Sequence, residues 1–210
     1  MPPFRLHCFG ESGNSYKAAL MLELCGLTWE PVIVDFFNGE TRTPEWRARV
    51  NEMGEAPVLE MPGKTLTQSG VMLVNLSRMT GKFGAGDEDG RQEILRWMLF
   101  DNHKFTANIA TLRFLVCFLK TGETPVTAFL RGRVAAAAAI LDRHLAGSKF
   151  VTGAQATIAD ISLVGYLYYP EDYGVDWKQH PHIQRWLADV KALPGWKAPY
   201  DLMARAPAKH

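Results

Sequence analysis

A turn from strand to helix near the beginning of the chain restricts its fold more than any other feature. Residues 4–9 are rich in strand-forming types, and an apolar pattern at helical spacing follows the turn. Ser12, Asn14 and Ser15 in the turn are residue types that cap helix N-termini. Gly13 has no side chain and lets a ligand approach the backbone. Because the first N–H groups of a helix attract anions, the turn predicts either an ordinary helix cap or an anion site.

The elements that follow this turn alternate between strand and helix. The first helix ends at Gly26, a residue type that terminates helices. Residue types and periodicity then predict a strand at 28–35, a short helix at 44–50, a hairpin of strands 56–61 and 64–67, and a helix at 71–79. The order is βαβαββα, and two strands joined by a helix predict a parallel βαβ unit.

Two residues at element boundaries have both a structural and a binding interpretation. Pro57 begins a strand, where a residue without an N–H is tolerated. If the Ala56–Pro57 bond is cis, the N–H and C=O groups of Ala56 face outward and can pair with an extended, peptide-like ligand. Ser69, as N-cap of the next helix, offers its hydroxyl group to a carboxylate. Pro57 could equally be an edge proline and Ser69 an ordinary cap.

The second half of the chain is predicted to be helical throughout. A Gly-rich, acidic linker covers residues 82–90, and no convincing strand follows it. Apolar periodicity predicts helices over 91–119, 126–145, 161–169 and 181–193. Thr157 and Asp160 form a capping-box variant before the third of these.

Composition excludes several classes of function. The chain has 47% hydrophobic and 21% charged residues, a net charge of +1 and scattered basic residues, which is unlike a nucleic-acid-binding protein. It contains no apolar run of membrane-spanning length and no signal peptide, so a cytoplasmic location is expected. Cys8, Cys25 and Cys117 form no CxxC pair and are expected to be buried free thiols. His180 and His182 lack further ligands nearby, so no metal site is expected.

Four stretches, taken in order, resemble the cytosolic glutathione transferase family, and the resemblance covers essentially the whole chain. They are residues 12–17, 39–44, 51–59 and 68–70. The Ser-Gly-Asn-Ser sequence in the first is most similar to the serine-type bacterial members. The resemblance implies an α/β thioredoxin-like, glutathione-binding domain at 1–81, a linker at 82–90 and an all-α C-terminal domain at 91–210. It also implies glutathione as co-substrate and a homodimer.

The resemblance also assigns parts of glutathione to residues of this chain. The γ-glutamyl carboxylate would meet Ser69, with Gln68 beside it, and the cysteinyl backbone would pair with Ala56, before Pro57. The sulfur would lie over the start of the first helix, near Ser12.

The sulfur has to be held as a thiolate, because the thiolate is the nucleophile. A thiol with a pKa near 8.5 must lose about 1.5 pKa units to be half ionised at pH 7, which is roughly 2 kcal/mol. A helix terminus supplies ~0.3–1 kcal/mol, so a hydrogen bond of ~1.5–3 kcal/mol is also needed. Ser12 is the first candidate donor, since its spacing to Lys17 matches the family. Asn14 and Ser15 can also donate and stay open as alternatives.

Glu55 is a departure from the family pattern. The family often has Lys or Gln there, which helps to bind the glycine end of glutathione, whereas a glutamate would repel that carboxylate unless it points away. Arg42 or Lys64 could supply the positive charge instead.

The pocket for the electrophile is expected to include aromatic and cationic residues. The candidates are Phe9, His103, Phe105 and Arg113. An aromatic stripe at helical spacing is also typical of a core or a dimer contact, so this interpretation stays open.

Two functions follow from these residues. The first is a glutathione transferase, in which the glutathione thiolate attacks a hydrophobic electrophile or a peroxide. The second is a non-catalytic ligand-binding or interaction protein on the same fold, because fold alone does not fix function.

Overall fold

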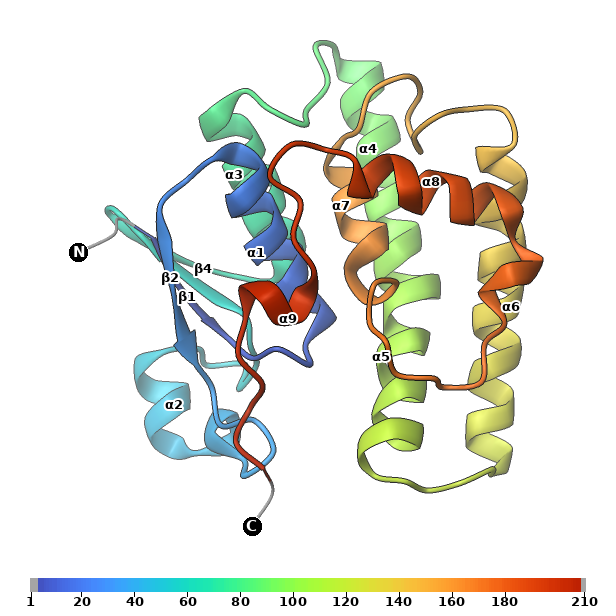
Figure 1. The fold of residues 1–210 in the computed structure, drawn as a ribbon. Coiled ribbons are helices and arrows are strands. Elements are labelled where there is room, and N and C mark those ends of the chain that lie inside the picture. The colour runs from blue at the N-terminus through green and yellow to red at the C-terminus, as the bar shows by residue number, and fades with distance from the viewer. Residues whose placement is uncertain (1–3, 209–210) are drawn as a thin grey trace. The chain divides into compact units, whose positions relative to one another are not determined.

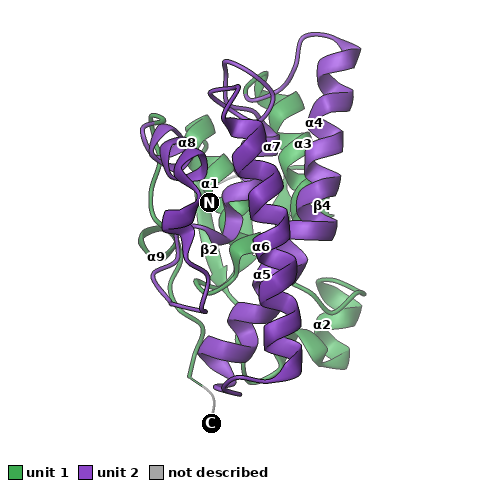
Figure 2. Cartoon of the chain, turned by 90° about the vertical axis from the view of Figure 1, so that its right-hand side faces the viewer, with its two compact units in different colours: residues 1–82, 193–210 green, residues 83–192 purple. Residues whose placement is uncertain are grey.

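The structure is a computed structural model that describes residues 4–208, and it divides into two compact units (Figures 1 and 2). Unit 1 contains the described residues up to Lys82 and those from Leu193 onward. Unit 2 contains the residues from Phe83 to Ala192. None of the helices in 4–208 combines the length and the hydropathy needed to cross a membrane.

Unit 1 has the predicted βαβαββα order around a mixed sheet. The sheet order is β2-β1-β3-β4; β1 pairs with β2 in parallel and with β3 antiparallel, and β3 and β4 form the hairpin. The predicted thioredoxin-like fold is therefore confirmed. The elements are β1 (Phe4–Cys8), α1 (Gly13–Cys25), β2 (Trp29–Ile33), the 3-10 helix η1 (Glu40–Arg42), α2 (Pro44–Arg49), β3 (Val58–Met61), β4 (Lys64–Thr67), α3 (Ser69–Thr80) and, later in the chain, α9 (Pro199–Leu202).

Helix α1 is the central helix of unit 1, lying beside α3 (Figure 1). Ser12 caps its N-terminus, and Gly26 ends it in the left-handed conformation with φ 72°, a conformation that glycine adopts without strain. Nearly every side chain of α1 is buried, including the charged Lys17. Because α1 is enclosed in this way, its N-terminus is held in one position.

The side chains of β1 alternate between the two faces of the sheet. Leu6 and Cys8 are fully buried, and successive side chains of a strand alternate, so His7 lies on the opposite face. There its ring packs nearly perpendicular to the Trp46 ring of α2, with the ring centroids 5.8 Å apart. His7 Nε2 also lies 2.6 Å from a carboxylate oxygen of Glu60, whose other oxygen accepts from Arg5. The hydrogen bond with His7 is the main reason that the pKa of Glu60 is lowered.

Unit 2 is helical, which confirms the predicted all-α part of the fold. Its elements are α4 (Glu88–Phe100), the π-helical segment η2 (Asp101–Thr106), α5 (Ala107–Arg113), the π-helical segment η3 (Phe114–Phe118), α6 (Pro125–Leu145), α7 (Ile158–Leu163), the 3-10 helices η4 (Val164–Tyr166) and η5 (Trp177–Gln179), and α8 (Pro181–Lys191).

The first long helix of unit 2 begins earlier than the sequence suggested. Asp87 caps α4 by accepting a hydrogen bond from the Gly90 N–H group at 2.7 Å. The last residues of the linker expected at 82–90 are therefore helical. The helix expected over 91–119 is also not uniform, since it passes through two π-helical segments.

Helix α7 begins at the predicted capping box and is shorter than expected. Thr157 and Asp160 form the box, with the Thr157 N–H group 2.8 Å from Asp160 Oδ2. The helix ends at Leu163, and the apolar run continues as the 3-10 helix η4 instead of extending over 161–169.

Residues 193–208 belong to unit 1, whereas the sequence placed them in the helical domain at 91–210. The reason is that this segment packs along α1. The Tyr16 hydroxyl donates to the carbonyl of Lys197 at 2.9 Å, and Lys197 Nζ lies 2.8 Å from Glu23 Oε2. Helix α9 also contacts α1 (Figure 1).

Candidate functional site

The site is built on the turn at residues 9–12, which connects β1 to α1. The Ser12 N–H group donates to the Phe9 carbonyl at 3.1 Å and closes the turn. Ser12 Oγ accepts from the Ser15 N–H group at 3.1 Å, and Ser12 is 6% exposed. Because the hydroxyl oxygen acts as the acceptor in this bond, the hydroxyl proton remains available for donation to a ligand.

The helix dipole favours an anion at the start of α1. No acidic residue lies in the first turn of α1. The positive end of the helix dipole is therefore not offset by a side-chain carboxylate within that turn. A thiolate placed there would be stabilised.

Asn14 and Ser69 connect the starts of two helices. Ser69 Oγ donates to Asn14 Oδ1 at 3.3 Å, so the N-termini of α1 and α3 lie together. The sequence predicted Ser69 as the N-cap of α3. The N-cap is instead Gln68, which has φ 65° and makes no side-chain capping bond, and Ser69 is the first helical residue. The one-residue difference is of the usual size for helix ends.

Gln68 and Glu55 also contact each other. Gln68 Nε2 donates to Glu55 Oε2 at 2.9 Å, and Glu55 is exposed. Asn51 Nδ2 donates to the Glu55 carbonyl at 2.9 Å, a bond that closes the loop directly before Ala56. The Ala56–Pro57 bond in this loop is cis, which is the condition under which the N–H and C=O groups of Ala56 were expected to face outward. The Glu55 side chain is therefore engaged by a neighbouring amide.

The two candidates for the positive charge lie on the surface of unit 1. Arg42 ends η1 and is exposed, and its guanidinium group lies close to Gly39. Lys64 begins β4 and is also exposed. The assignment of either one to the glycine end of glutathione stays a prediction.

Ser15 differs from the other two candidate donors in its surroundings. It is fully buried, and its Oγ makes no hydrogen bond within residues 4–208. Its backbone N–H group, in contrast, is held by Ser12. The structure thus gives Ser15 a direct backbone role at the site.

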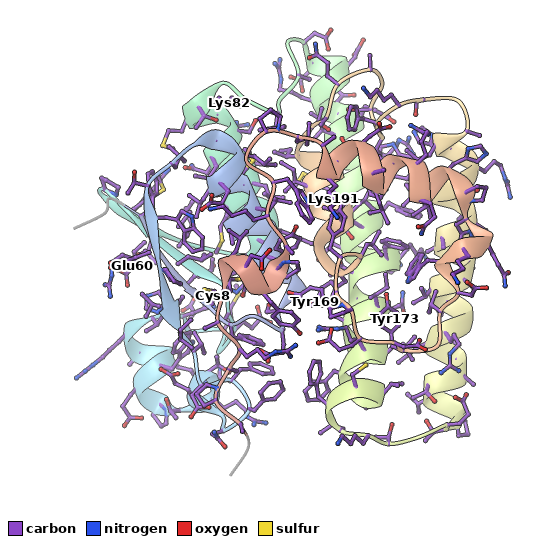
Figure 3. All side chains as sticks on the ribbon, in the orientation of Figure 1. Cys8, Glu60, Lys82, Tyr169, Tyr173 and Lys191 are labelled. Atoms are coloured by element: carbon purple, nitrogen blue, oxygen red, sulfur yellow. The ribbon has the colours of Figure 1, made fainter. Side chains whose placement is uncertain are left out.

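The cysteines match the prediction for two of three residues. Cys8 lies within the sheet (Figure 3) and is fully buried, and burial raises the pKa of its thiol to about 12. Cys25 is buried and free as well. Cys117 was expected to be buried but is half-buried in η3. A thiol with the raised pKa of Cys8 is a poor nucleophile at neutral pH.

The predicted pocket residues come from both units. Phe9 in unit 1 is buried and stacks on Phe36 with ring centroids 4.5 Å apart. Phe105 in unit 2 is fully buried, whereas His103 is exposed. Their use by an electrophile stays a prediction.

Arg113, the cationic member of this set, has partners inside unit 2. Its guanidinium group lies 3.9 Å from the centre of the Tyr169 ring and forms an ion pair of 2.8 Å with Glu171. Tyr169 and the buried Tyr173 lie beside α5 (Figure 3). Arg113 is therefore enclosed by aromatic and acidic groups.

Sequence reasoning gave Gly10 and Glu11 no role at the site. Glu11 is 6% exposed, and its carboxylate accepts a hydrogen bond from the Ala206 N–H group at 2.9 Å. The Gly10 N–H group donates to the Ala204 carbonyl at 2.7 Å. No local signal identifies these bonds, because Ala206 is 195 residues away from Glu11 along the chain.

Among residues 4–208 there is no cluster of three or more His, Cys, Asp or Glu side chains that could hold a metal ion.

Comparison with known families decides the identity. The model of the glutathione S-transferase N-terminal domain matches residues 3–76, and that of the C-terminal domain matches residues 76–189. The chain belongs to the glutathione S-transferase family. The predicted family and enzyme class are thereby confirmed.

Individual members of the glutathione S-transferase family resemble this chain over nearly its full length. A solved structure from Rhodopseudomonas palustris, named as a possible glutathione S-transferase, is 33% identical with a TM-score of 0.87, covering 94% of this chain and 98% of that chain. Glutathione S-transferase D7 of Drosophila melanogaster is 26% identical, over 94% of this chain and 88% of the relative. A glutathione transferase from Burkholderia graminis is 26% identical with a TM-score of 0.81, covering 92% of this chain and 85% of that chain; it was solved with two glutathione molecules bound per subunit.

Proposed function

We propose that this glutathione S-transferase is a serine-type enzyme in which Ser12 holds the glutathione sulfur as a thiolate. The observation that carries the proposal is the hydrogen bonding of Ser12. Its Oγ accepts from the Ser15 N–H group, so the hydroxyl proton is left for the sulfur. The bond also fixes the Ser12 side chain at the positive end of α1.

The rest of glutathione binds along the N-terminus of α3 and the loop before β3. Ser69 and Gln68 bind the γ-glutamyl carboxylate, and the backbone of Ala56, before the cis Pro57, pairs with the cysteinyl residue. Support comes from the hydrogen bond between Ser69 and Asn14, which links the carboxylate side of the site to the start of α1. It also comes from the bound glutathione in the Burkholderia graminis relative.

Arg42 or Lys64, both of which are exposed, forms the ion pair with the glycine carboxylate of glutathione. Glu55 does not oppose it strongly, because its carboxylate is engaged by the Gln68 amide. Removing that amide is expected to weaken binding of glutathione.

In the reaction, the thiolate attacks an electrophilic carbon, a C–S bond forms, and the leaving group departs with its electron pair. The thiol proton goes to solvent before this step. A peroxide is the alternative electrophile. The thiolate then attacks one peroxide oxygen, an S–O bond forms while the O–O bond breaks, and the other oxygen leaves as alkoxide or hydroxide and takes up a proton from solvent. The resulting sulfenic acid reacts with a second glutathione thiol to give glutathione disulfide and water. Aromatic and cationic residues would receive an apolar electrophile, namely Phe9, His103, Phe105 and Arg113.

We also propose a homodimer that works in the cytoplasm, where glutathione is abundant. Large apolar side chains support the dimer, since Leu95 and Leu99 of α4 are 53% and 60% exposed. Sedimentation of the purified protein tests it, and a monomer at micromolar concentration would contradict it.

The test of the thiolate proposal is Ser12→Ala, with the pKa of bound glutathione read from the ultraviolet absorbance of the thiolate. Loss of a hydrogen bond to a charged group corresponds to a rise of about one to two pKa units and a fall of roughly ten- to hundredfold in kcat/KM at pH 7. Calorimetric binding of glutathione should persist. An unchanged thiolate signal would assign the donor role to Asn14 or Ser15, and glutathione binding without turnover in the wild type would favour the non-catalytic alternative.

A further inference from the structure

We propose that residues 203–206 form a strap that positions Ser12 for thiolate stabilisation, an inference that rests on the proposed function. The strap holds the turn at residues 9–12, in which Phe9 and Ser12 are the outer residues and Gly10 and Glu11 the central ones. Both central residues are bonded to the strap.

The turn both donates a hydrogen bond to the strap and accepts one from it. The Gly10 N–H group donates to the Ala204 carbonyl at 2.7 Å, and the Ala206 N–H group donates to Glu11 Oε2 at 2.9 Å. Arg205, between the two, lies 3.6 Å from Glu11 Oε1 and places its guanidinium group 3.7 Å above the Tyr200 ring. The turn is therefore fixed through its main chain and through a buried carboxylate.

The approach of the strap leaves no room at Gly10. A Cβ atom at this position would lie 2.9 Å from the carbonyl oxygens of both Met203 and Ala204, which are main-chain atoms. The backbone conformation at Gly10 would otherwise accept another residue, since its φ lies outside the left-handed region. Packing against the strap is therefore what requires glycine here.

The path of the chain before the strap aligns it with α1. Lys197 pairs with Glu23 near the end of α1, and Tyr16 donates to the Lys197 carbonyl. From there the chain passes through α9 to the turn that precedes α1 (Figure 1). The segment thus holds the turn relative to the helix, which is what the placement of a hydrogen-bond donor needs.

Glu11 is a positioning residue under this proposal. Its carboxylate is buried one residue before Ser12, and a like charge close to a thiolate disfavours ionisation. Arg205 and the Ala206 N–H group offset that charge while holding the turn in place.

The first experiment compares Gly10→Ala with Gly132→Ala, a matched control on α6 where a Cβ meets nothing within 4 Å. We expect Gly10→Ala to raise the pKa of bound glutathione and to lower kcat about tenfold, because a misplaced donor loses much of its hydrogen bond. The KM for glutathione should change less than twofold, since the hydrogen bonds of the strap go to Gly10 and Glu11 and not to Ala56, Gln68 or Ser69. Gly132→Ala should change none of these quantities.

A second pair keeps the test decisive if Gly10→Ala does not fold. Glu11→Ala removes the acceptor of the Ala206 N–H group, and Glu11→Gln retains an acceptor of similar size. We expect Glu11→Ala to lower kcat about tenfold and Glu11→Gln to recover most of the loss. Folded variants with the wild-type thiol pKa and kcat would overturn the strap.

Ser12→Ala, measured in parallel, separates the two proposals. If Ser12→Ala raises the thiol pKa and the strap variants do not, only the strap is wrong. If Ser12→Ala leaves the thiol pKa unchanged, the role of Ser12 is wrong and the strap, as a device that places Ser12, is overturned with it.

Discussion

Helices α1 and α7 begin with the same type of N-cap residue but differ in what their N-termini bind. Each helix has a hydroxyl residue at the N-cap, Ser12 in α1 and Thr157 in α7. At the third helical position they differ, because α1 has Ser15 and α7 has Asp160.

At α7 the polar groups of the helix end are satisfied inside the protein. Asp160 is fully buried, and its carboxylate accepts from the Thr157 and Val151 N–H groups and from the Trp186 indole, each at 2.8 Å. Burial raises the pKa of Asp160, while these donors act against the rise. The Asp160 carboxylate is therefore committed to donors inside the protein.

At α1 the corresponding carboxylate is missing. Ser12 accepts one N–H group, and the first turn contains no acidic residue. A helix start with a completed capping box stabilises the fold, whereas one with the same cap and no acid can stabilise a bound anion. The identity of the third helical residue is therefore what separates the two roles.

The largest expected effect is at the completed box. Asp160→Ala should lower the free energy of unfolding by about 3–5 kcal/mol, because it removes a cap and leaves several buried donors without an acceptor. Urea denaturation followed by circular dichroism measures this.

The matched control for that experiment is Asp160→Asn, which retains one acceptor oxygen and the shape of the side chain. It should lose less stability than Asp160→Ala. A loss below about 1 kcal/mol in the alanine variant would show that the two helix starts do not differ as argued.

The next experiment gives α1 the acid that it lacks. Asn14→Asp is isosteric and keeps an oxygen for the Ser69 hydroxyl, so the change is mainly one of charge. A carboxylate in the first turn should stabilise α1 by about 0.3–1 kcal/mol and disfavour the thiolate. We expect kcat/KM at pH 7 to fall roughly tenfold as the thiol pKa rises by about one unit.

Gln155→Glu is the control for Asn14→Asp, since it adds the same charge at an exposed position in unit 2. It should leave the thiol pKa unchanged. If both variants behave alike, the absence of an acid from the first turn of α1 has no bearing on the site.

Much of this architecture was predictable because its signals are local. The strand and helix periodicities identified the βαβαββα order, and the Thr157–Asp160 spacing identified the start of α7. Ser12 was predicted as a capping residue from its type and position, and it is the N-cap. The burial of Cys8 follows from strand alternation.

The features that were not predicted depend on contacts between distant parts of the chain. The assignment of residues 193–208 to unit 1 depends on bonds such as that of Ala206 to Glu11, which no local pattern encodes. The burial of Ser15 depends on the enclosure of α1 on nearly all sides. Among the three candidate donors, tertiary packing rather than residue type therefore provides the distinction.

The smallest expected effect is that of Ser15→Ala, which tests whether the Ser15 hydroxyl takes part in the reaction. Its Oγ is buried without a partner in the described part of the chain, and removing such a group relieves an unfavourable burial. Ser15→Ala keeps the N–H group that Ser12 accepts, so we expect the free energy of unfolding to rise by up to about 1 kcal/mol with kcat/KM unchanged. Ser148→Ala removes a similarly unpartnered hydroxyl from unit 2 and should act alike. A fall in kcat/KM in Ser15→Ala but not in Ser148→Ala would show that the Ser15 hydroxyl donates to the sulfur. The donor role would then include a residue of the first helical turn as well as the N-cap Ser12.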